Sequence, residues 1–98
     1  MIPEISEIKD KDIFYSSLKK EVLIVKTVEI ADENHAGFFY TAIYHSSEES
    51  TEVIIRERCW FSTAQYNTRF RKEHLKITTL DEIYLLPLQN ATKQALQQ

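Results

Sequence analysis

The chain has 98 residues, 43% of them hydrophobic, and a formal net charge of −3 at pH 7. This composition is typical of one small globular domain and excludes a disordered or collagen-like chain. The single glycine, Gly37, excludes dinucleotide fingerprints, phosphate-binding loops and nucleophile elbows in their usual form, because these motifs need several glycines.

Three features predict a location in the cytoplasm. The single cysteine, Cys59, excludes an intramolecular disulfide and suits a reducing compartment. The opening "MIPEISEIKD" carries acids and lacks an apolar stretch of signal-peptide length. No run approaches the ~20 apolar residues that a membrane-spanning helix needs, so we expect no membrane contact.

The first predicted element is a short helix over residues 13–20, "IFYSSLKK". Asp10 or Asp12 stands at the position of a capping residue. Ile13, Phe14 and Leu18 would then face a sheet.

Three strands are predicted next, over residues 21–31, 37–46 and 52–62. The first is rich in β-branched residues, and short polar connections ("ADENHAG" and "SSEEST") separate the runs. Such spacing predicts an antiparallel meander. In the third strand a period of two divides the side chains between two faces. One face is apolar except for Glu57, so Cys59 is expected to lie buried in the core. The residues expected on that inward face are Val53, Ile55, Cys59 and Phe61, and those opposite are Ile54, Arg56, Arg58 and Trp60.

Two interpretations remain open for residues 62–79. Ser62 and Gln65 form a capping-box pattern that predicts a helix, with Tyr66, Phe70 and Ile77 at roughly helical spacing. Alternatively, the segment is a loop that leads into a fourth strand, "EHLKIT".

Further along, Thr79 and Glu82 form a second capping-box pattern. It precedes an apolar stripe that Pro87 interrupts, which predicts either a kinked helix or a short element followed by a terminal helix. The stripe consists of Leu80, Ile83, Tyr84, Leu88, Ala91 and Ala95.

These elements predict an α+β fold in a single domain over residues 1–98. Its core is a small antiparallel β-meander with flanking N- and C-terminal helices. One or two more strands would close the meander toward a partly open Src-homology-3-like barrel.

The basic side chains are concentrated in one segment. Residues 56–76 hold six arginines and lysines against two acids, within a chain that is acidic overall. Such a patch can bind phosphates, with Trp60 stacking on bases. The competing interpretation is structural: the arginines pair with acids of neighbouring strands and Trp60 packs beneath a helix. The candidate binding residues are Arg56, Arg58, Trp60, Arg69, Arg71, Lys72 and Lys76, together with Tyr40 and Tyr44 as an exposed aromatic patch for a protein partner.

No motif indicates catalysis, a cofactor or a metal site. The histidines His35, His45 and His74 share no ligand spacing with Cys59. The resulting hypothesis is a small non-catalytic accessory or regulatory protein that acts through protein–protein contacts, including self-association through sheet edges. The alternative is binding of single-stranded nucleic acid or another polyanion through residues 56–76. An enzyme is the third class, for which His45, His74 and Tyr44 are the first residues to inspect.

Overall fold

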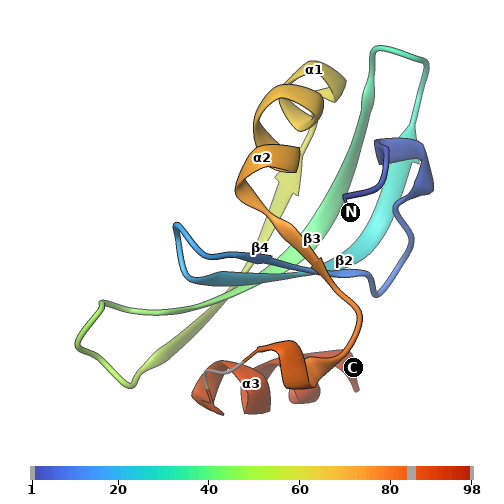
Figure 1. The fold of residues 1–98 in the computed structure, drawn as a ribbon. Helices are drawn as coiled ribbons and strands as arrows, with labels where there is room; N and C mark the ends of the chain where they lie inside the picture. The colour runs from blue at the N-terminus through green and yellow to red at the C-terminus, as the bar shows by residue number, and fades with distance from the viewer. Residues whose placement is uncertain (1, 84–85, 98) are drawn as a thin grey trace.

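The computed structural model describes residues 2–83 and 86–97, and it has an α+β fold built on one five-stranded antiparallel sheet (Figure 1). The strand order is β4-β3-β2-β1-β5, so β4 and β5 are the two edges of an open sheet. The strands are β1 (Ile13–Ser16), β2 (Glu21–Ile30), β3 (Ala36–His45), β4 (Val53–Trp60) and β5 (Leu75–Ile77). The helical elements are η1 (Ile5–Glu7), α1 (Thr63–Gln65), η2 (Tyr66–Phe70), α2 (Arg71–Glu73), η3 (Leu80–Glu82) and α3 (Leu86–Leu96).

The predicted meander is confirmed, because β2, β3 and β4 occupy the three expected runs. Each pairs antiparallel with the next along the chain. A bulge between Val25 and Thr27 interrupts the register of β2 on β3, whereas β3 and β4 pair without interruption from Phe38–Trp60 to His45–Val53.

The predicted N-terminal helix over residues 13–20 is wrong, because this segment begins with a strand. Ile13 pairs with Ile24 of β2 and with Ile77 of β5, so β1 lies between two strands. β-branched and aromatic side chains favour this half-buried, alternating environment over an isolated helical turn. Asp12 does not cap a helix; its side chain accepts a hydrogen bond from the backbone N–H of Lys9.

For residues 62–79 both interpretations describe part of the structure. Ser62 caps a helix as predicted, since its Oγ accepts a hydrogen bond from Gln65 N at 3.1 Å. The helical segment 63–73 comprises α1, the π-helical turn η2 and α2, and its Tyr66 and Phe70 are buried. The chain then continues directly into β5, which contains Ile77.

At the C-terminal end, the short element followed by a terminal helix is confirmed. Pro87 lies in the first turn of α3, where its missing N–H costs no helical hydrogen bond. Glu82 accepts from Thr78 Oγ1 at 2.6 Å, so its side chain bonds one residue earlier than the predicted partner, Thr79. Leu88 is buried, while Tyr84 and the side chain of Leu80 lie outside the described part of the structure.

Helical elements cover both faces of the sheet (Figure 1). One face of the sheet, which we call the aromatic face, packs against the helical segment 63–73 and η1. The opposite face, which we call the α3 face, packs against α3 and Ile83. The buried core residues of the aromatic face are Phe14, Leu23, Val25, Phe38, Tyr40, Ala42, Tyr66 and Phe70, with Ile5, Ile8 and Ala36. Those of the α3 face are Val22, Ile24, Ile43, Ile77, Ile83 and Leu88. Within residues 2–83 and 86–97, no helix is long and apolar enough to cross a membrane.

Candidate functional site

The strand β4 has a backbone edge that pairs with no other strand among the described residues. It hydrogen-bonds only to β3, and the opposite row of N–H and C=O groups is free of sheet partners. Its five residues from Ile55 to Cys59 are all exposed. An edge of this length presents a template for another extended chain.

The predicted inward face of β4 is exposed except at Val53, which packs against the core. Cys59 is exposed rather than buried, and Ile55 and Phe61 are each 51% exposed. The reason is that α3 packs on Val22, Ile24 and Ile43 but leaves the other half of its sheet face uncovered. Trp60, on the opposite side of the strand, lies against the core of the aromatic face.

The uncovered half of the α3 face carries an apolar patch, which we call the β4 patch: Phe39, Ile55, Cys59 and Phe61. The rings of Phe39 and Phe61 meet edge to face at 5.0 Å. Phe39 is 39% exposed. Glu57 stands beside the patch and accepts from Lys26 Nζ at 3.4 Å and from Thr41 Oγ1 at 3.1 Å. The β4 patch is therefore an apolar surface adjoining a free strand edge.

Gly37 explains how closely the chain folds around this patch. A Cβ at this position would overlap the ring of Phe61 and the carbonyl oxygen of Trp60. Only glycine lets the backbone of β3 approach the end of β4 so closely.

Arg58 and Trp60 both have partners within the chain, as the competing structural interpretation expects. Arg58 Nη1 donates to Glu21 Oε1 at 2.9 Å, and its guanidinium lies 5.1 Å from the Tyr44 ring centroid. Trp60 packs edge to face on Phe70 at 5.3 Å, and its Nε1 is buried without a hydrogen-bond partner in the described structure. The indole is half-buried against the core of the aromatic face.

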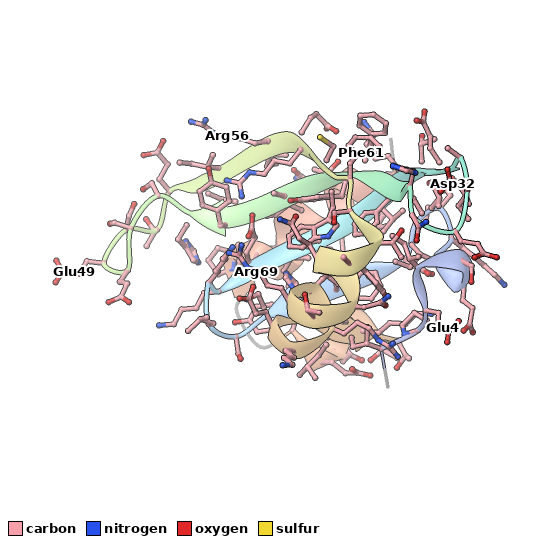
Figure 2. All side chains as sticks on the ribbon, turned by 90° about the horizontal axis from the view of Figure 1, so that it is seen from above. Glu4, Asp32, Glu49, Arg56, Phe61 and Arg69 are labelled. Atoms are coloured by element: carbon pink, nitrogen blue, oxygen red, sulfur yellow. The ribbon has the colours of Figure 1, made fainter. Side chains whose placement is uncertain are left out.

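The other basic candidates lie away from β4. Arg69 bonds Glu73 at 3.4 Å on the helical segment, and Arg71 Nη2 donates to the carbonyl oxygen of Ile2 at 3.1 Å. Lys76 lies 3.7 Å from Asp12. Arg71, Lys72 and Lys76 border a cleft of about 440 Å³ beside β5. The basic segment is therefore divided between the two opposite edges of the sheet. In Figure 2, Arg56 and Phe61 lie along β4, while Arg69 lies on the helical segment.

Tyr40 and Tyr44 do not form the predicted exposed aromatic patch. Tyr40 is buried, and desolvation raises the pKa of its phenol. Tyr44 is half-buried beneath Arg58. Among the described residues, Phe39 and Phe61 are the exposed large aromatic side chains, and they lie on the other face.

The histidines are dispersed. His74 is buried and stacks on Phe70 with ring centroids 4.0 Å apart, and burial lowers the pKa of its imidazole. His35 lies 2.9 Å from Asp32 in the β2–β3 turn, where hydrogen bonding, chiefly from the backbone of Asn34, lowers the pKa of Asp32. His45 and Tyr44 end β3, and the strands β2 and β1 separate them from the β5 edge near His74. Across the described residues, no three His, Cys, Asp or Glu side chains gather as metal ligands.

One sequence signal, Glu57, could have identified the exposed face, although the prediction followed the apolar residues around it. A charged residue in the middle of an otherwise apolar face is rarely tolerated in a core without a partner.

Comparisons of this chain with protein-family models, curated proteins and solved structures find no match.

Proposed function

We propose that this protein is a non-catalytic binding protein that takes up an extended segment of a partner protein along β4. The single observation that carries this proposal is the free edge of β4, eight residues long, with exposed apolar side chains beside it. In strand addition the backbone hydrogen bonds supply affinity, and contacts of alternate side chains supply specificity.

The two sheet edges differ in how well they are protected. β5 is only three residues long, and short edge strands are a common protection against unwanted pairing. β4 contains no proline, and no bulge interrupts its pairing with β3. Its remaining protection is the charged triplet Arg56-Glu57-Arg58. This contrast favours β4 as the binding edge.

The rival hypothesis is the binding of single-stranded nucleic acid or another polyanion. It loses support because Trp60 is half-buried against Phe70 and Arg58 is paired with Glu21. Its remaining support is the cleft bordered by Arg71, Lys72 and Lys76. Salt-sensitive binding of fluorescent single-stranded DNA or RNA that Lys72→Ala weakens, and Arg56→Ala does not, would favour it.

The exposed cysteine permits a direct test of the β4 proposal. Because Cys59 is the only cysteine, a thiol-specific photocrosslinker attaches at one position, on the β4 patch. The matched control is Cys59→Ser/Leu75→Cys, which moves the label to β5, at a leucine that is 62% exposed.

We expect the label at residue 59 to crosslink a defined partner from lysate of cells that make the protein, and unlabelled protein to compete. Ile55→Lys should compete poorly, because it places a charge in the β4 patch. Equal crosslinking from both labels, or undiminished competition by Ile55→Lys, would refute binding at β4.

Two finer features are also proposed. The order of strands and the bulge in β2 support a partly open Src-homology-3-like barrel whose β4 and β5 edges do not join. Folds of this kind host many functions, so function is argued from β4 alone. The exposed thiol of Cys59 supports a location in the reducing cytoplasm.

A further inference from the structure

The charges at the centre of β4 restrict which strand can pair with it. In an antiparallel ladder, the backbone groups of alternate residues point to opposite sides of the strand. Each residue of an added antiparallel strand lies opposite one residue of β4, and the backbone groups of the two point either toward each other or away from each other. The side chains of two opposite residues lie on the same face of the sheet.

Under this rule a second copy of β4 meets like charges in three of its four central registers. Two copies related by a two-fold axis can only be centred on a residue, because the backbone groups of opposite residues either both point toward the partner strand or both point away from it. The four central positions of β4 are Ile55, Arg56, Glu57 and Arg58, and each of the three charged ones places an identical charge opposite itself, whereas a pair centred on Ile55 does not. Centring on Glu57 also places Arg56 opposite Arg58. Since like charges directly opposite destabilise strand pairs, β4 disfavours self-association in the three registers centred on its charged residues.

Arg56 is the charge of β4 most accessible to a different partner. Arg56 is exposed, and no ion pair involves it among the described residues. The side chains of Glu57 and Arg58 are 61% and 41% exposed, although each has a partner in its own chain, Lys26 and Glu21 respectively. Of the three charged residues of β4, Arg56 is therefore the one whose charge is not balanced by an ion pair among the described residues.

We infer that β4 selects a segment of a different protein in which acidic, basic and acidic residues follow one another between apolar residues. This inference rests on the proposed strand addition. The acidic residues lie opposite Arg56 and Arg58, and the basic residue lies opposite Glu57. The flanking apolar residues lie opposite Ile55 and Cys59, on the β4 patch. Because the triplet is symmetric, the charge pattern is the same when read in either direction.

The test compares two synthetic peptides, Thr-Val-Glu-Lys-Glu-Val-Thr and its charge-reversed control Thr-Val-Lys-Glu-Lys-Val-Thr. Each is titrated into the full ¹⁵N-labelled chain while backbone amide NMR signals are followed. Reversal turns three opposite-charge pairs into like-charge pairs, so we expect about tenfold weaker binding of the control. The net charge of the protein, −3, would favour the control instead, so the expected preference reports the local charges of β4.

Two charge variants locate the effect. Arg56→Glu should abolish or invert the preference, whereas Lys72→Glu, which makes the same change in net charge on α2, should leave it intact. Sedimentation equilibrium at the titration concentration should show a monomer.

Each outcome has a defined meaning. Shifts confined to β4 amides with the expected preference support the inference. Equal binding of both peptides at β4 refutes the charge selection and leaves strand addition standing. Shifts elsewhere, or no binding by either peptide, refute both. A dimer whose β4 amides are protected from hydrogen exchange refutes the selection of a different protein over a second copy.

Discussion

Replacing Arg58 with methionine tests whether this arginine is structural. Methionine retains much of the apolar length of the side chain but removes the charge. Loss of the Arg58 guanidinium leaves the Glu21 carboxylate without the donor that lies 2.9 Å away. The Glu21 side chain is only 7% exposed. The contact of the guanidinium with the Tyr44 ring is lost as well.

The expected cost follows from these two contacts. A hydrogen bond between charged groups contributes about 1.5–3 kcal/mol. Because the Arg58 side chain is 41% exposed, solvent screening places the pair at the low end of that range. The cation–π contact adds about 0.5–1 kcal/mol. We therefore expect Arg58→Met to lower the free energy of unfolding by about 2–2.5 kcal/mol, and Tm by about 8–20 °C for a domain of this size.

Urea denaturation at neutral pH measures this cost. The control is Arg56→Met, on the same face of the same strand but without an ion pair in the described structure, which should change stability by less than about 0.5 kcal/mol. Glu21→Gln in the Arg58→Met background should recover part of the loss, since no buried carboxylate is then left unpaired. Equal losses from Arg56→Met and Arg58→Met would refute a structural role for the Glu21 pair.

Three further predictions concern the core and its edges. Gly37→Ala should lower the free energy of unfolding by about 1–3 kcal/mol in urea denaturation, because the added Cβ overlaps the end of β4; unchanged stability would mean that the strands are less closely packed there. Phe70→Ala should lower the free energy of unfolding by about 3–5 kcal/mol in the same measurement, since Phe70 is fully buried among aromatic rings. Phe61→Ala, at an exposed ring, should cost less than about 1 kcal/mol, and similar costs for the two variants would contradict the assigned burial. The pKa of His74 lies below its ordinary value of 6.5, so the unfolded chain binds its proton more readily. Stability should therefore fall as the pH is lowered through 6.5, and His74→Gln should flatten this dependence in urea titrations at several pH values.

The sequence predicted the central meander because the local signals there agree with the tertiary structure. Strands β2 and β3 are rich in β-branched and aromatic residues, and polar turns separate them from the neighbouring strands. The Ser62 cap could also be predicted from the sequence, since a capping box is a local hydrogen-bond pattern.

The errors arose where the environment is set by distant residues. Residues 13–16 form a strand because β2 and β5 lie on either side of them, which no local pattern reveals. The exposure of Cys59 depends on where α3 stops covering the sheet, and that is a property of the packed domain. Only Glu57 indicated locally that the face was open.

The pairing of β1 with β5 joins parts of the chain that are distant in sequence, since Ile13 lies opposite Ile77. Closing such a loop costs entropy before the few contacts of a three-residue strand repay it. The β2–β3–β4 meander, by contrast, forms through short turns. Folding should therefore begin in the meander and end with β5. Hydrogen exchange would then find the weakest protection in β5, so the sheet would open first at the edge farthest from β4.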